Sequence, residues 1–156
     1  MDTLTFKDAG ADDRTQLFQL FASVRADDLG MHTWEPALRD QMLRLQFEAQ
    51  RRGYLQQFPD ADARLILRNG SPVGWVIVDR SDAGLRVVDI AILSSERCQG
   101  VGTRVLRALQ EEAAAEDRPV TLSVMHLNVR ALELYLRLGF RAVGETDLHT
   151  LMEWRR

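Results

Sequence analysis

The sequence contains a single cysteine, Cys98, so no disulfide can form within the chain. Its first residues lack the basic and then apolar pattern of a secretory signal peptide, and we therefore expect a cytoplasmic protein. No stretch approaches the roughly 18 uninterrupted apolar residues of a membrane-spanning helix, so no membrane association is expected. No two His or Cys residues have the spacing of metal ligands, which predicts no metal site.

The sequence also has little excess of one charge over the other, because 20 basic and 23 acidic residues leave a formal net charge of -3. Proteins that bind phosphate backbones usually show a basic excess, so we expect no nucleic-acid partner. With 46% apolar and 28% charged residues, the composition is that of a folded protein. A chain of 156 residues fits one domain, and folding removes about two thirds of the extended-chain surface from water.

The N-terminal part of the sequence predicts one strand and two helices. A short strand is expected at residues 4–6. Helical periodicity follows and ends near Gly30, and the connection 30–36 leads into a second helix that begins at Pro36 and closes at Gly53. The apolar residues that carry the two helical patterns are Leu17, Leu20, Phe21, Val24, Met42, Leu45 and Ala49.

The remainder of the sequence alternates strands and helices. Two runs, 64–68 and 73–78, flank Asn69-Gly70 and predict a hairpin, and a covered central strand follows at 85–93. A helix from Val101, a strand at 120–124, a helix at 131–138 that ends at Gly139, and two closing strands at 140–143 and 148–154 complete the pattern. We therefore predict one mixed α/β domain with a largely antiparallel sheet.

A glycine loop, Arg97-Cys98-Gln99-Gly100-Val101-Gly102, joins the central strand to the next helix. Glycines allow close approach of a ligand, and the free N–H groups of a helix N-terminus bind phosphate. Thr103-Arg104 after Gly102 excludes the P-loop pattern, and Val105 stands where the dinucleotide fingerprint requires glycine. The loop therefore predicts a different pyrophosphate site, the alternative being a structural tight turn.

Two motifs in this order resemble the GNAT superfamily of acetyl-CoA-dependent N-acetyltransferases. Arg97-x-x-Gly100-x-Gly102 matches the family's pyrophosphate motif, and the segment from Asn128 through Tyr135 to Gly139-Phe140 matches its second half. The resemblance implies an α/β (α+β) fold with a mixed, largely antiparallel sheet of six to seven strands and about four helices. Residues 1–156 would form one acetyltransferase domain, with acceptor-side helices in 1–60 and an acetyl-CoA-binding core in 61–156.

The resemblance implies transfer of an acetyl group from acetyl-CoA to a primary amine of a small molecule, peptide or protein, by direct attack. The alternative is a non-catalytic acyl-CoA-binding or sensing module with the same fold. Many members of the family form homodimers through their C-terminal strands, and residues 148–154 would supply such an edge here.

Cofactor contacts follow from the same resemblance. The pantetheine arm would pair with the backbone of Ile92 to Ser94, and Arg97 and Arg130 would approach phosphates, unless they are solvated surface arginines. Asn128 would bind the arm, cap its helix, or do both. The residues expected to contact the cofactor are Ile92, Leu93, Ser94, Arg97, Cys98, Gln99, Gly100, Val101, Gly102, Thr103, Asn128 and Arg130.

Two side chains are candidates for the chemistry. Tyr135 is expected to be the general acid that protonates the leaving thiolate, and otherwise a core tyrosine of its helix stripe. Asp89 interrupts an apolar strand, where burial of a carboxylate requires hydrogen bonds or a partner. We expect it to position or deprotonate the amine, the alternative being a structural acid paired with an arginine or a backbone N–H.

Other side chains are candidates for contacts to the acceptor, for a second base and for a reactive thiol. The acceptor pocket of this fold would place Trp34, Tyr54 and Asp89 against the amine. His32 and Glu35, which lie with Trp34 in the connection 30–36, are also candidate contacts. Packing or surface roles are the alternatives for Trp34, Tyr54, His32 and Glu35. His126 is a candidate base or a hydrogen-bonded structural residue. Cys98 lies near a helix N-terminus and an expected phosphate site, which suggests redox sensitivity of its thiol.

Overall fold

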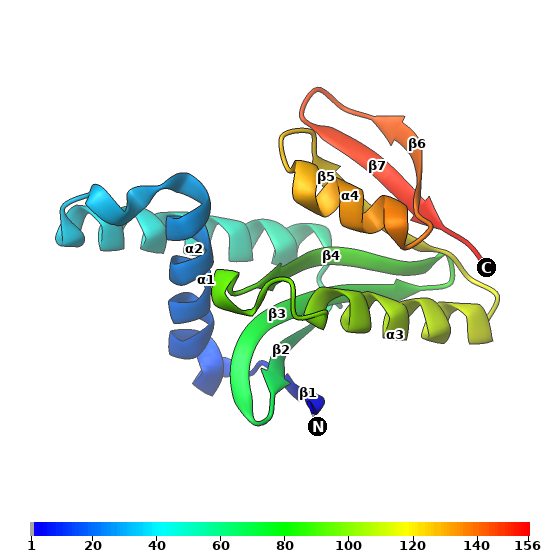
Figure 1. The fold of residues 1–156 in the computed structure, drawn as a ribbon, viewed down its shortest axis with the longest axis horizontal. Coiled ribbons are helices and arrows are strands. Elements are labelled where there is room, and N and C mark those ends of the chain that lie inside the picture. The colour runs from blue at the N-terminus through cyan, green and yellow to red at the C-terminus, as the bar shows by residue number, and fades with distance from the viewer. Residues whose placement is uncertain (1) are drawn as a thin grey trace.

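The computed structural model describes residues 2–156 and contains one seven-stranded sheet with four α-helices (Figure 1). This confirms the predicted fold class. The helices are α1 (Arg14–Leu29), α2 (Pro36–Gln57), α3 (Val101–Ala115) and α4 (Val129–Arg137). The strands are β1 (Leu4–Asp8), β2 (Asp62–Arg68), β3 (Ser71–Ser81), β4 (Gly84–Ile92), β5 (Val120–Met125), β6 (Arg141–Glu145) and β7 (His149–Trp154).

The strands are ordered β1-β2-β3-β4-β5-β7-β6, and every neighbouring pair except β4 and β5 is antiparallel. The parallel pair requires a crossover, which α3 provides. The β2–β3 hairpin turns at Asn69-Gly70, where both residues have positive φ angles of 52° and 84°. This is the turn that an Asn-Gly pair favours.

Each face of the sheet carries its own apolar core. In Figure 1, α3 and α4 lie in front of the sheet and α2 passes behind it. The front core includes Val105, Leu106 and Phe140, and the rear core includes Phe21, Phe47 and Trp75. Residues 61–156 therefore build most of one core, and the two N-terminal helices cover the other.

One boundary and one stripe residue of the second helix differ from the prediction. The helix that begins at Pro36 continues through Gly53 to Gln57, because nothing near Gly53 terminates it and Phe58 caps it with an N–H bond of 2.7 Å to the Tyr54 carbonyl. Leu45 is 62% exposed, so it is not on the buried stripe of α2, which Leu43 and Phe47 form.

The end predicted for α4 is confirmed, since Gly139 follows it with a φ of 92°.

None of the helices within residues 2–156 combines the length and apolar character that crossing a membrane requires.

Candidate functional site

The strands β4 and β5 separate over most of their length. They pair only at Leu85 with Val120 and Arg86 with Thr121, although β4 continues to Ile92 and β5 to Met125. Arg86 Nη2 donates a 2.8 Å hydrogen bond to Ser123 Oγ where the separation begins. The edges of two central strands are thereby left facing a gap.

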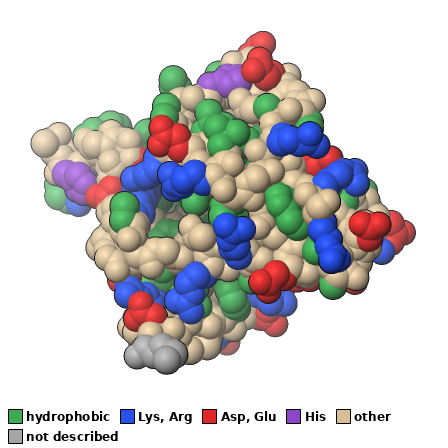
Figure 2. Space-filling view, turned by 45° about the vertical axis from the view of Figure 1, so that its right-hand side comes forward, with side chains coloured by type: hydrophobic (Ala, Val, Ile, Leu, Met, Phe, Trp, Pro, Cys, Tyr) green, Lys and Arg blue, Asp and Glu red, His purple; other side chains and the backbone are tan. Residues whose placement is uncertain are grey.

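A groove of about 640 Å³ follows this gap between α1, β4, the start of α3, and α4. Figure 2 shows the molecule hollowed on this face, with Lys and Arg side chains around the hollow. The groove brings together Tyr135 and most of the residues expected to hold a cofactor: Ile92, Arg97, Cys98, Gly100, Val101, Gly102, Thr103, Asn128 and Arg130. The remaining expected residues, Leu93, Ser94 and Gln99, do not line it.

The loop before α3 presents free N–H groups to the groove. Cys98 and Gly100 adopt positive φ angles of 64° and 77°, which turn the chain sharply into the helix. Within residues 2–156, no backbone N–H from 98 to 103 donates to a backbone carbonyl, and the first such bond runs from Arg104 to Gly100. No acidic residue lies in the first turn of α3, so this end of the helix suits an anion.

Arg97 holds this loop in place. Its Nε donates to the Ile92 carbonyl at 3.2 Å, and its Nη2 lies 3.3 Å from Asp28 of α1. Beside it, Ser94 Oγ donates to Asp27, which also lies 2.7 Å from His32 Nε2. Two carboxylates at the end of α1 therefore connect the acceptor-side helices to the loop.

Residues of α4 form the opposite wall of the groove. Asn128 caps the helix by accepting a 3.3 Å hydrogen bond from the Ala131 N–H, so its capping role is confirmed. Tyr135 is buried, and its ring packs edge-on against Phe140 with centroids 5.7 Å apart. Burial, with a smaller effect of the Asp89 charge, raises the pKa of Tyr135 to about 12. The phenol is therefore protonated at neutral pH.

The side of the sheet on which Asp89 lies is set by a bulge. Ile77 opposes Asp89 and Val78 opposes Val87, which leaves Val88 without a partner. Val87 belongs to the front core, and strict alternation would place Asp89 on that face. Because the extra residue reverses the alternation, Ile90 packs in front and Asp89 faces the α1 and α2 side.

The Asp89 carboxyl is part-buried and forms no ion pair within residues 2–156. It accepts a 2.8 Å hydrogen bond from Trp75 Nε1, and the Ile90 backbone N–H and the Tyr54 side chain lie close enough to lower its pKa. Among residues 2–156, no arginine nitrogen lies within 4.0 Å of it. Burial raises the pKa of Asp89, and the Trp75 bond and the Arg25 charge offset this only in part.

A small cavity of about 50 Å³ reaches Asp89 from the rear face. We call it the acceptor cavity. Phe21, Phe47 and Trp75 form its aromatic walls, and Tyr54, whose pKa is raised by burial and then by the Asp89 charge, contributes the phenol. Its other lining residues are Leu17, Gln50, Arg51, Ala63, Arg64 and Ile77.

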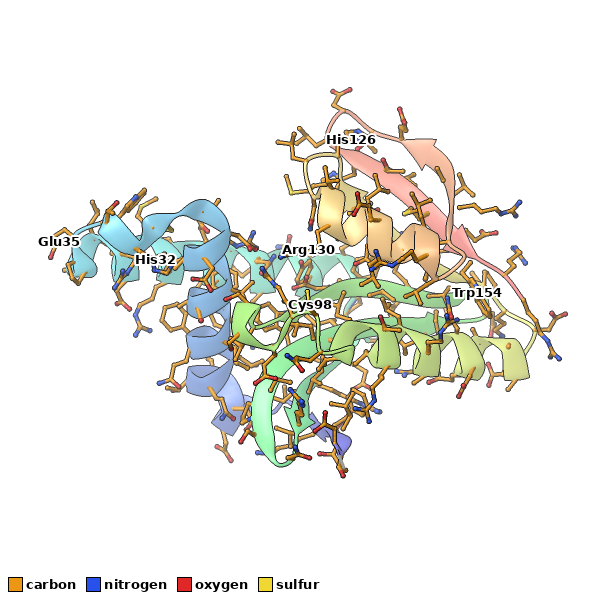
Figure 3. The ribbon with its side chains drawn as sticks, in the orientation of Figure 1. His32, Glu35, Cys98, His126, Arg130 and Trp154 are labelled. Atoms are coloured by element: carbon orange, nitrogen blue, oxygen red, sulfur yellow. The ribbon has the colours of Figure 1, made fainter. Side chains whose placement is uncertain are left out.

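Other candidates from the sequence lie away from the groove and from the acceptor cavity. Trp34 is 42% exposed, His32 pairs with Asp27, and Glu35 accepts bonds from the first N–H groups of α2. Figure 3 shows His32 and Glu35 at the far tip of the helical pair. His126 bonds to Thr146 and Thr150 at 3.1 Å each, so the structural interpretation of His126 is confirmed.

Sequence reasoning missed the contributions of α1 and β3. Val24, Arg25, Asp28 and Leu29 line the groove, and Trp75 binds Asp89. Arg25 lies four residues after Phe21, on the edge of the predicted apolar stripe, which was the one available signal. Nothing in the sequence marks Trp75, because its face is set by the bulges of β3 and β4.

The comparisons with known proteins agree with this geometry. Residues 24–140 match the model of the acetyltransferase (GNAT) family. The PaiA N-acetyltransferase of Thermoplasma acidophilum, solved with coenzyme A, is 10% identical with a TM-score of 0.75, and 99% of each chain is covered. An acetyltransferase of Thermus thermophilus is 17% identical with a TM-score of 0.72, covering 99% of this chain and 97% of that one. At these identities, the likeness concerns the fold.

Proposed function

The chain belongs to the acetyltransferase (GNAT) family and is an acyltransferase whose acetyl donor is acetyl-CoA; from this premise we propose that it acetylates a primary amine of a small molecule, peptide or protein by direct attack. The observation that carries the proposal is that the buried phenol of Tyr135 lines the groove along the gap between β4 and β5, while Asp89 of β4 lies close enough for its charge to raise the pKa of Tyr135.

The groove fits the family's donor. The free N–H groups of residues 98–103 at the positive end of α3 match a pyrophosphate. The gap beside β4 matches an extended arm. When bound, acetyl-CoA supplies a thioester carbonyl for attack.

Asp89 and Tyr135 have opposite proton-transfer roles in this proposal. The Asp89 carboxylate, whose raised pKa makes it a better base than an exposed aspartate, accepts a proton from the incoming ammonium or amine. The amine nitrogen forms a bond to the acetyl carbon, and the carbon–sulfur bond breaks. Tyr135 donates its hydroxyl proton to the departing thiolate and is reprotonated from solvent.

The size of the acceptor cavity favours a primary amine as the acceptor. The acceptor cavity of about 50 Å³ holds a few water molecules at most, which matches an amino group on an unbranched carbon. Phe21, Phe47 and Trp75 give the cavity apolar walls beside Asp89.

Release of free thiol from acetyl-CoA, measured over a panel of primary amines, tests this function. We expect amine-dependent release together with binding of acetyl-CoA by calorimetry. Binding without release for every amine would instead support the non-catalytic acyl-CoA-binding module, and absence of binding would contradict both functions.

A further inference from the structure

The acceptor cavity is too small to hold a whole substrate. About 50 Å³ accommodates an amino group and its neighbouring methylene, so the rest of an acceptor must lie against α1 and α2. The side chains at that position therefore decide which amines are accepted.

Charge around the cavity is predominantly basic. Asp89 is the one carboxylate in its lining within residues 2–156, whereas Arg51 and Arg64 both line it. Arg64 is compensated by Asp62 at 2.7 Å and Asp8 at 3.4 Å. Arg51 stands over the Phe47 ring at 5.5 Å and forms no ion pair with any residue of 2–156.

Arg25 of α1 is a second cation without an ion pair among residues 2–156, although Glu48 acts on Arg51 and Asp89 on Arg25 at longer range. Its guanidinium lies 5.2 Å from the centroid of Phe21, and it is half-buried in the wall of the groove. It lies close enough to influence both Asp89 and Tyr54 electrostatically, yet no carboxylate of residues 2–156 approaches within 4.0 Å of it. Phe21 and Phe47, which carry the two guanidinium groups, are themselves 5.3 Å apart.

We infer that the acceptor is a primary amine that also carries a carboxylate, with the amine directed to Asp89 and the carboxylate bound by Arg25 and Arg51. This inference rests on the proposed acetyl transfer. Stacking on the aromatic rings fixes the two guanidinium groups, which present paired donors that suit a carboxylate. A polycationic amine would be repelled by the same two groups.

Matched acceptors test the inference in the full-length protein. We would compare glycine, β-alanine and γ-aminobutyrate with the carboxamide of each, and with putrescine as a dication, by thiol release. We expect the best carboxylate to exceed its own amide in kcat/KM by at least about tenfold, the discrimination that one charged hydrogen bond supports.

Variants assign the preference to residues. Arg25→Gln and Arg51→Gln should each lower kcat/KM for the preferred carboxylate about tenfold or more and leave kcat/KM for its amide nearly unchanged. Arg51→Gln should also leave the Kd of coenzyme A nearly unchanged, whereas Arg25 lines the groove, so its variant is compared at saturating acetyl-CoA. Arg44→Gln is the matched control, because Arg44 stacks on Phe18 at 4.3 Å in the same helical pair but lines neither the acceptor cavity nor the groove. Calorimetric titration of the carboxylate into protein saturated with coenzyme A measures its affinity without turnover. The unmodified protein and Arg44→Gln should bind the carboxylate more tightly than Arg25→Gln and Arg51→Gln.

The failures are distinguishable. If only amides or putrescine are acetylated, or if the arginine variants weaken coenzyme A instead of the carboxylate, the inference is wrong while acetyl transfer stands. If no amine in the panel releases thiol, the proposed function fails and the inference fails with it.

Discussion

Asp89 and Tyr135 are the two groups to which the proposal gives opposite proton-transfer roles. Burial raises both pKa values, but the phenol starts from 10.0 and rises to about 12, whereas the carboxyl starts from 3.8. The phenol therefore holds its proton, and the carboxyl becomes a stronger base than an exposed aspartate. A base and an acid are what amine attack and thiolate departure require.

Tyr135→Phe should lower kcat by about 100-fold, since it removes a proton donor and leaves the ring in place. The Kd of acetyl-CoA should stay within about twofold, because the edge-on contact with Phe140 remains. Parallel thiol-release kinetics and calorimetry measure both quantities. An unchanged kcat would remove Tyr135 from the mechanism and return it to the core.

Asp89→Asn should lower kcat/KM about 100-fold or more and abolish the acid limb of the pH–rate profile. In the unmodified protein, activity should fall as pH decreases through the raised pKa of Asp89, because protonation removes the base. Rates measured across the acidic to neutral range check this. Full activity of the variant would leave Asp89 with only a structural role.

The same substitution has an expected effect on stability. A folded-state pKa raised above its unfolded value means that the folded protein binds the proton more tightly, so stability falls as pH rises through that pKa. Asp89→Asn removes the buried charge and should raise the free energy of unfolding near neutral pH, but not in acid, where Asp89 is already protonated. Urea titrations at the two pH values test this, and a loss at neutral pH would mean that the carboxylate stabilises the fold.

At the scale of elements, the sequence predicted the strands, the helices and the glycine loop because their signals are local. Apolar periodicity, Asn69-Gly70 and Gly139 each act within a few residues. The face on which Asp89 lies depends on the unpaired Val88, and the wall formed by α1 depends on how two distant segments pack. Register shifts and long-range packing produce no periodic pattern in the sequence. The face of Asp89 and the groove wall formed by α1 could therefore be found only from the structure.

The start of α3 gives a prediction of its own. Gly100→Ala places a side chain at a φ of 77°, where it meets no neighbouring atom but is strained by about 1–2 kcal/mol. Gly70→Ala, at a φ of 84° in the remote hairpin turn, should cost a similar amount. Urea titrations should show comparable losses, and calorimetry should show weakened coenzyme A binding for Gly100→Ala alone. Equal affinities would mean that the loop does not hold the phosphates.

At the scale of the molecule, both halves of the chain form the groove. Residues of α1 face those of α3 and α4 across it, and Asp28 pairs with Arg97 at 3.3 Å between the two halves. In the proposed site, backbone amides bind the phosphates, and a chain with a net charge of -3 can then bind a polyanionic donor. A global basic excess is not needed.

Because the groove draws on both halves, its ligand should stabilise them together. Coenzyme A at 100 times its Kd should raise the free energy of unfolding by about 2.7 kcal/mol and shift one cooperative transition. Thermal or urea unfolding followed by far-UV circular dichroism measures this. Two separate transitions, with only one of them shifted, would contradict a groove shared by both halves.

The central claim is that the gap between β4 and β5 is a site of acetyl transfer to an amine. The most direct measurement quantifies free coenzyme A thiol and acetylated amine in the same reaction, with the unmodified protein and with Tyr135→Phe. We predict one acetylated amine for each thiol released, at a rate that falls about 100-fold in the variant. Thiol released without acetylated amine, or equal rates for both proteins, would contradict the account.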